Sequence, residues 1–185
     1  MDHVHIGRRL VPAVALLCGL SAGAAAAETG RTPLQIGSAQ LAGDEPSYLD
    51  LGVGSFGSGA AHLAPDSAEG RIELRYGKKL FHLGPALGLL ANTNGGLFGY
   101  GGLYADVRLG NLVITPFGGL GGYHRGDGEH LGGTFQFRLS LAVAYELANR
   151  SRLGVQYAHI SNAGILDINP GDNELLVTYS LPLGF

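Results

Sequence analysis

The stretch Thr134–Leu147, TFQFRLSLAVAYEL, indicates the fold class of this chain. One set of alternate positions is apolar and the other is polar or small, which is the period-2 pattern of a β-strand with two different faces. The stretch is fourteen residues long, whereas an ordinary strand has about five or six. A tilted strand that crosses a membrane needs about 9–11 residues. The pattern therefore predicts a membrane-spanning strand with a short extension. The apolar positions are Phe135, Phe137, Leu139, Leu141, Val143, Tyr145 and Leu147.

Seven further stretches alternate in the same way. Eight is the smallest even number of strands in bacterial outer-membrane barrels. The sequence therefore predicts an all-β fold, an eight-stranded antiparallel transmembrane β-barrel. The other predicted strands are 48–57, 70–77, 80–91, 96–109, 112–122, 151–161 and 173–185.

Composition agrees with this class. The chain is 45% hydrophobic and has 32 glycines in 185 residues, and glycine at this level argues against helices. After residue 28 no segment approaches the ~20 consecutive apolar residues of a spanning helix. A soluble β-sandwich is the alternative, since its strands alternate too. The terminal Phe185 favours the barrel because it resembles the closing strand of outer-membrane barrels.

The N-terminal stretch has the order of a secretory signal. Arg8 and Arg9 precede an apolar run that ends in AAAAET, and this basic, apolar, small-residue order is typical of signal peptides. We therefore expect residues 1–27 to be a signal peptide cleaved after Ala27. Residues 28–185 then form the barrel, with a short periplasmic N-terminal segment.

Removal of that segment limits the chemistry that remains. Cys18 lies inside the apolar run, but the residue just before it is Leu17 and not the small residue that a lipoprotein site would want. The mature chain has no cysteine, which excludes disulfides and thiolate metal sites. It keeps 10 basic and 14 acidic residues, a formal charge of −4. No basic surface that would bind nucleic acid is expected.

Charged residues occupy the polar face of several predicted strands. In a narrow barrel they would lie in the lumen, where a balanced set of charges pairs and fills the interior. We expect this structural role for four acids and four bases: Asp50, Arg71, Glu73, Arg75, Asp106, Arg108, Arg138 and Glu146.

The connections between predicted strands alternate in length. Three of the four odd-numbered loops are long, whereas the other connections, KK, GN and ANR, are tight. Outer-membrane barrels have short periplasmic turns and longer external loops. The N-terminus is therefore predicted to be periplasmic, and the strand 151–161 to end at the outer surface.

The segment YAHISNAG, Tyr157–Gly164, has a histidine and a serine on an apolar strand face. By parity His159 and Ser161 share the lipid-facing side with Tyr157. Residues i and i+2 lie about 6.6 Å apart along a strand, so an imidazole could reach the hydroxyl and act as its base. Alternatively, the two polar residues only mark where the strand leaves the membrane.

HISNAG followed by NPGDNE resembles the lipid A 3-O-deacylase (PagL-type) family of outer-membrane esterases. That family has an H-x-S-N segment near the end of the penultimate strand, a Gly/Pro/Asn-rich loop, and an acid at the start of the last strand. The motif resemblance covers Tyr157 to Phe185. It implies that Ser161 is the nucleophile, His159 the general base and Asn162 an oxyanion donor.

The resemblance makes Glu174 the expected acid that orients His159. Parity raises a conflict, because even positions of the last strand should point inward and Asn173 has the outward parity. A bulge at the strand start would reconcile Glu174 with the site. Asp172 and Asn173 remain alternatives for the orienting group.

The resemblance implies an esterase that removes the acyl chain from the 3-position of lipid A in the outer leaflet of the outer membrane. Lipid A or lipopolysaccharide is then the substrate partner, other outer-membrane lipids surround the protein, and no cofactor or metal is needed. His124 and His130 are expected to be solvated. The sequence leaves the oligomeric state open, a homodimer included. The alternatives are a non-catalytic small barrel for adhesion or envelope integrity, and a phospholipase-like barrel, which needs calcium ligands.

Overall fold

The structure is a computed structural model that describes residues 31–57 and 67–184. The predicted signal peptide 1–27, part of the first long loop and Phe185 lie outside these ranges. Eight long strands and three short ones form within these ranges. The described residues contain no helix that is long and apolar enough to cross a membrane. The long strands are β3 (Ser47–Phe56), β4 (Ser67–Arg75), β5 (Gly84–Asn92), β6 (Leu97–Tyr104), β8 (Leu112–His124), β9 (Phe135–Glu146), β10 (Arg152–Ser161) and β11 (Asp172–Leu183).

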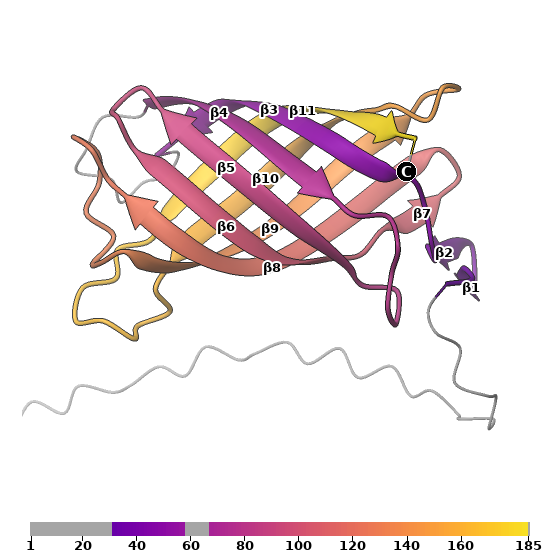
Figure 1. The fold of residues 1–185 in the computed structure, drawn as a ribbon, viewed down its shortest axis with the longest axis horizontal. Helices are drawn as coiled ribbons and strands as arrows, with labels where there is room; N and C mark the ends of the chain where they lie inside the picture. Colours follow the sequence, from indigo (N-terminus) through magenta and orange to yellow (C-terminus); the bar gives the residue numbers. More distant parts are fainter. Residues whose placement is uncertain (1–30, 58–66, 185) are drawn as a thin grey trace, which may run out of the picture.

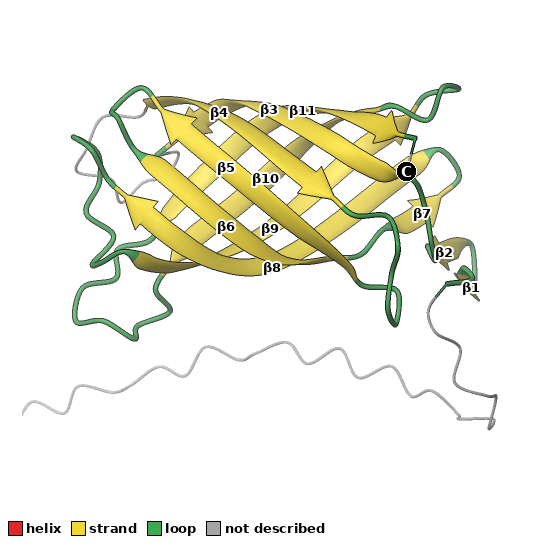
Figure 2. Cartoon of the chain, viewed as in Figure 1, coloured by secondary structure: helices red, strands yellow, loops and turns green. Residues whose placement is uncertain are grey.

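These strands close into an antiparallel β-barrel, which confirms the predicted fold class. Each long strand pairs with its neighbours in the chain, and β11 pairs with β3 to complete the circle. Figure 1 shows the strands strongly tilted around the barrel, and Figure 2 shows that loops and turns collect at its two ends. We call the end with the β9–β10 connection, residues 147–151, the turn end and the opposite one the loop end.

The two faces of the barrel wall differ as the alternation predicted. On β9, Leu139 and Leu141 expose 62% and 50% of their surface. Gln136 and Arg138, whose side chains point into the lumen, expose none. The same contrast holds on β10 and β11, where Val155 and Val177 point outward. An apolar outside around a polar inside is the pattern of a barrel whose wall faces lipid.

The lumen is filled by ion pairs and aromatic rings. Arg75 Nε lies 2.7 Å from Glu73 Oε1, and Arg71 pairs with both Glu73 and Asp50. Toward the loop end the interior is aromatic, with Phe56 stacked on Tyr123. The expected role of the lumen charges as internal packing is therefore confirmed: buried charges persist where they are paired.

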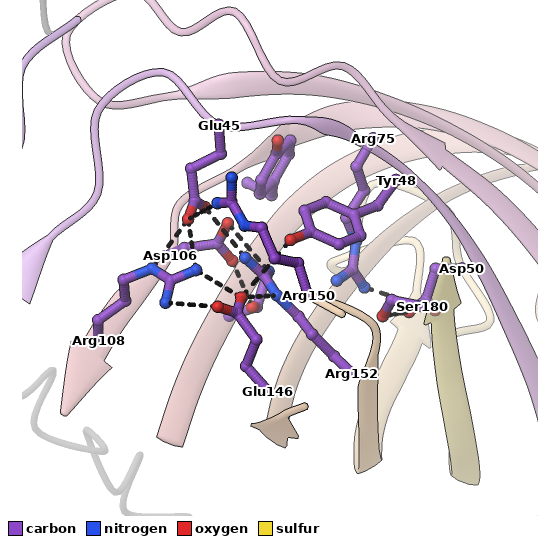
Figure 3. A network of polar contacts seen from close by, with 12 residues as sticks. Glu45, Tyr48, Asp50, Arg75, Asp106, Arg108, Glu146, Arg150, Arg152 and Ser180 are labelled. Atoms are coloured by element: carbon purple, nitrogen blue, oxygen red, sulfur yellow. Dashed lines mark hydrogen bonds and ion pairs between the residues drawn. The ribbon is translucent and has the colours of Figure 1, made fainter. Parts of the chain in front are cut away.

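A larger ion network closes the turn end (Figure 3). Arg152 lies 3.1 Å from Glu45, 3.3 Å from Asp106 and 3.1 Å from Glu146. Arg108 pairs with the same Glu146 at 2.5 Å. Glu45 comes from the segment before β3, so the network ties the N-terminal segment across this end of the lumen.

Two predicted strands are wrong in part. The expected strand 80–91 begins only at Gly84, because Leu80 and Leu83 close a turn in which Phe81 and His82 have positive φ. The expected strand 96–109 is divided into β6 and β7 (Val107–Leu109). Opposite the break lies Pro116 of β8, which has no N–H to donate to the ladder.

A short hairpin precedes the barrel and had no counterpart in the sequence prediction. It consists of β1 (Leu34–Ile36) and β2 (Ala39–Leu41), and β2 pairs with β7. Three-residue strands carry too little periodicity to be recognised in a sequence. The hairpin extends the wall at the turn end, away from the H-x-S segment.

Candidate active site

The site lies at the end of β10, directly before the β10–β11 loop. β10 and β11 pair without a bulge, with His159 opposite Asn173, Ala158 opposite Glu174 and Ile160 opposite Asp172. Successive side chains of a strand point to opposite faces. His159 and Asn173 therefore share the outer face.

The hydrogen bond between His159 and Asn173 defines the state of the imidazole. His159 Nδ1 lies 2.9 Å from Asn173 Oδ1. An amide oxygen only accepts, so the ring donates from Nδ1 and a neutral imidazole keeps its lone pair on Nε2. This is the tautomer that a general base requires.

Glu174 does not contact this histidine, and the expectation that it orients His159 is wrong. Its carboxylate is completely buried in the lumen and accepts hydrogen bonds from Arg138 at 3.2 and 2.5 Å. The bulge that would have turned Glu174 outward is absent from the continuous β10–β11 register. The parity argument for Asn173 was the better guide.

Asp172 has the same inward parity as Glu174. Its side chain is buried, and its Oδ1 accepts the backbone N–H of Asn173 at 2.6 Å. Asp172 thus fixes the first residues of β11 from the lumen side. The side chain on the His159 ring is that of Asn173.

Asn162 follows the serine but has a structural role that the sequence did not suggest. Its Nδ2 donates to the carbonyl oxygens of Leu131 at 2.9 Å and Ile168 at 2.7 Å. An amide nitrogen has two protons, and both are used. The expected role of the Asn162 side chain as an oxyanion donor is therefore wrong: it ties the β8–β9 and β10–β11 loops together.

The same asparagine ends β10 immediately after Ser161. The N–H of Ile165 donates to the Asn162 carbonyl at 3.1 Å, while Ala163 and Gly164 both have positive φ. These are the features of a type I′ turn. Asn162 Oδ1 also accepts the N–H of Gly164 at 3.0 Å. The turn leaves Ser161, which is partly exposed, at the loop-end rim of the barrel.

Ser161 and His159 are side by side on the outer face, but no hydrogen bond joins them within the described part of the chain. The two residues are separated by one residue of strand, about 6.6 Å along the backbone. Catalytic hydrogen bonds are often long without substrate and tighten when it binds. The arrangement can therefore supply a base and a nucleophile from one strand.

Gly171 is a further site residue that the sequence analysis did not single out. An added Cβ at this position would lie 2.8 Å from His159 Cε1 and 3.1 Å from Nε2, and Gly171 has a φ of +69°. The backbone at Gly171 therefore lies close to the Cε1–Nε2 edge of the ring. The glycine in NPGDNE was a signal for this role, since both a close approach and a positive φ favour glycine.

His124 ends β8 and His130 lies in the β8–β9 loop, both at the loop end. His124 and His130 are exposed and line an open pocket of about 270 Å³ with Arg125. Among residues 31–57 and 67–184 no group of three or more His, Cys, Asp or Glu could hold a metal ion. A pocket of about 830 Å³ lies at the turn end around Lys79 and Phe81, far from the H-x-S segment along the barrel.

Comparison with known proteins gives three consistent findings. The family model described as Lipid A 3-O-deacylase (PagL) matches residues 65–182. Over 52 residues the chain is 36% identical to the lipid A deacylase PagL of Bordetella bronchiseptica, a match that covers 28% of this chain and only 29% of that relative. The crystal structure of the outer membrane enzyme PagL has a TM-score of 0.57 at 19% identity, covering 74% of this chain and 99% of the other. At that identity the structural likeness shows a common fold.

Proposed function

The chain belongs to the lipid A 3-O-deacylase (PagL) family, and on this premise we propose that it hydrolyses the ester-linked acyl chain at the 3-position of lipid A. The outer leaflet of the outer membrane is the proposed place of reaction. Residues 1–27 serve in this proposal as the signal peptide that directs export.

The observation that carries the proposal is the direction of the site. His159 and Ser161 lie on the apolar outer face of β10, next to the exposed Tyr157, rather than in the lumen. The lumen beside them is filled, because Ile160 and Ala158 are completely buried. An ester that reaches Ser161 must therefore come sideways from the membrane, which suits a lipid substrate.

The first half of the proposed reaction transfers the acyl group to the enzyme. His159 Nε2 takes the proton of Ser161 as Oγ attacks the ester carbonyl. The tetrahedral intermediate collapses, the bond to the lipid A 3-oxygen breaks, and the imidazolium gives its Nε2 proton to that oxygen. Deacylated lipid A leaves, and Ser161 carries the acyl group.

The second half uses water. His159 Nε2 takes a proton from a water molecule that attacks the acyl-serine, and the second tetrahedral intermediate releases the fatty acid. The imidazolium returns the proton to Ser161 Oγ. Because the side chain of Asn162 is committed to two carbonyls, the donor to the oxyanion must be another group.

Asn173 orients the base in this mechanism. Its amide oxygen holds the Nδ1–H tautomer, as a carboxylate would, but it carries no charge to stabilise the imidazolium. The site is thus a Ser-His-Asn arrangement. It departs from the acid that the family resemblance led us to expect, and we expect slower turnover than an acid at residue 173 would give.

The test is mass spectrometry of lipid A from cells that express the wild-type chain or Ser161→Ala. Wild type should produce lipid A that has lost one 3-linked acyl chain, whereas Ser161→Ala should leave it intact. Expression of both proteins is checked by the heat-dependent gel mobility of folded barrels. If both folded proteins leave lipid A unchanged, the chain is a non-catalytic barrel and the proposal fails.

A further inference from the structure

Tyr157 lies two residues before His159 on the same outward face of β10. Its hydroxyl donates a hydrogen bond of 2.7 Å to Asn173 Oδ1, the atom that also accepts from His159 Nδ1 at 2.9 Å. We infer that Tyr157 is a positioning residue: it holds the Asn173 amide with its oxygen toward His159. The inference deepens the proposed function and rests on it for its kinetic consequences.

An amide, unlike a carboxylate, has two different ends. If the Asn173 side chain turned by about 180° around its last bond, an N–H would face His159 Nδ1. The ring would then have to accept at Nδ1 and carry its proton on Nε2. In that tautomer Nε2 cannot take the proton of Ser161, so one rotation of Asn173 would remove the base.

The geometry gives Asn173 Oδ1 two donors. A carbonyl oxygen has two lone pairs, and the hydroxyl of Tyr157 and the ring of His159 together use both. Donation by the hydroxyl also draws charge onto this oxygen, since hydrogen bonds in a chain polarise one another. Tyr157 therefore contributes to the orientation of the amide and to the strength of its bond with His159.

The described residues beside His159 on the outer face carry no charge. On β9 the residues opposite His159 and Ser161 are Leu139 and Phe137. From the β10–β11 loop, the backbone of Gly171 lies close to the Cε1–Nε2 edge of the ring. Arg138 and Glu174 pair with each other on the lumen side of the wall, where the side chain of Asp172 is also buried.

The kinetic test is a double-mutant cycle of Tyr157→Phe and Asn173→Asp on the full-length protein in detergent, with lipopolysaccharide as substrate. Tyr157→Phe should lower kcat about tenfold, the size of one hydrogen bond, with KM unchanged. In the Asn173→Asp background the same change should cost less than about twofold, because a carboxylate presents an oxygen either way round. Tyr179→Phe, another outward tyrosine on β11, is the matched control and should change neither constant.

The pH profile separates positioning from packing. Asn173→Asp should move the acidic limb of kcat/KM to higher pH, because the carboxylate stabilises the imidazolium, whereas Tyr157→Phe should lower the whole profile. An increase in KM with an equal effect in both backgrounds would show that Tyr157 only contacts lipid, and would overturn the inference.

A second readout does not depend on activity. Nitrogen-15 chemical shifts distinguish the two imidazole tautomers, and His159→Gln identifies the signal of this ring. The wild type should show the Nδ1–H form, and Tyr157→Phe should show a mixture. An unchanged tautomer in folded Tyr157→Phe would reject the inference even if the protein hydrolysed no lipid. Conversely, the wild type could hydrolyse no lipid while Tyr157→Phe still showed the mixture of tautomers. That result would support the inference although the proposed function had failed.

Discussion

Each face of the wall formed by β9, β10 and β11 carries a pair of polar side chains that bind each other, and the two pairs serve different purposes. On the lumen side Arg138 binds Glu174 at 2.5 Å, and both are completely buried. On the outer side His159 binds Asn173 at 2.9 Å, and both are partly exposed. Arg138 and Glu174 must both be present, because either charge alone would be buried without a partner, which is costly. The outer pair leaves one ring nitrogen free for chemistry.

This comparison teaches that stability and reactivity are divided by strand parity. Adjacent residues such as Asn173 and Glu174 belong to different systems although they are neighbours in the chain. A change on the inner face should therefore lower folding stability, whereas a change on the outer face should lower turnover. The predictions below test this division.

The largest effect is expected for Ser161→Ala. Without a nucleophile, turnover should fall by about 10⁴-fold or more, as when a serine triad loses its serine. The free energy of unfolding should stay within about 0.5 kcal/mol of wild type, because the side chain is partly exposed at the rim. Ester hydrolysis and urea unfolding in detergent measure the two quantities. Near-normal turnover would remove Ser161 from the mechanism.

Asn173→Ala should have the next largest effect on activity. The His159 ring loses the amide oxygen that accepts from its Nδ1, so turnover should fall by about 10²–10⁴-fold, as when the orienting acid of a serine triad is altered. Stability should change by less than about 1 kcal/mol. Asp172→Asn is the neighbouring control on the lumen side. If Asp172→Asn were the inactive variant instead, the orienting group would have been misassigned.

Glu174→Gln should reverse this pattern. Arg138 keeps its buried charge but loses its partner at 2.5 Å, and breaking a buried ion pair costs about 3–5 kcal/mol. Turnover per folded molecule should remain near wild type. Asp167→Asn, at an exposed loop position, should leave stability unchanged. A stable but inactive Glu174→Gln protein would show that this acid serves the reaction after all.

The smallest effect is expected for Gly171→Ala. The new methyl group would meet the far end of the His159 ring at 2.8 Å, so the ring must shift from the position in which its Nδ1 donates to Asn173. We expect about a tenfold loss of kcat, the size of one weakened hydrogen bond. Gly164→Ala is a matched control, because it has a similar positive φ of +75° but no atom within 4 Å of the added methyl. Equal losses in both variants would point to backbone strain rather than to the ring.

The sequence by itself determined the wall of the barrel and half of the site. Alternation is a local property, so Thr134–Leu147 identified a strand with one apolar face, and the same rule placed Arg71, Glu73 and Arg138 inside. The H-x-S spacing placed His159 and Ser161 on one outward face for the same reason. The alternation missed the turn at Leu80–Leu83, the break opposite Pro116 and the short β1–β2 hairpin.

What the tertiary structure decided was which side chain meets His159 across the strands. That depends on the register between β10 and β11, and a shift of one residue exchanges the two faces of a strand. The structure pairs His159 with Asn173 without a bulge, which sends Glu174 to Arg138 in the lumen. The role of Asn162 was equally hidden, because its partners Leu131 and Ile168 lie on two loops that meet only in the folded barrel.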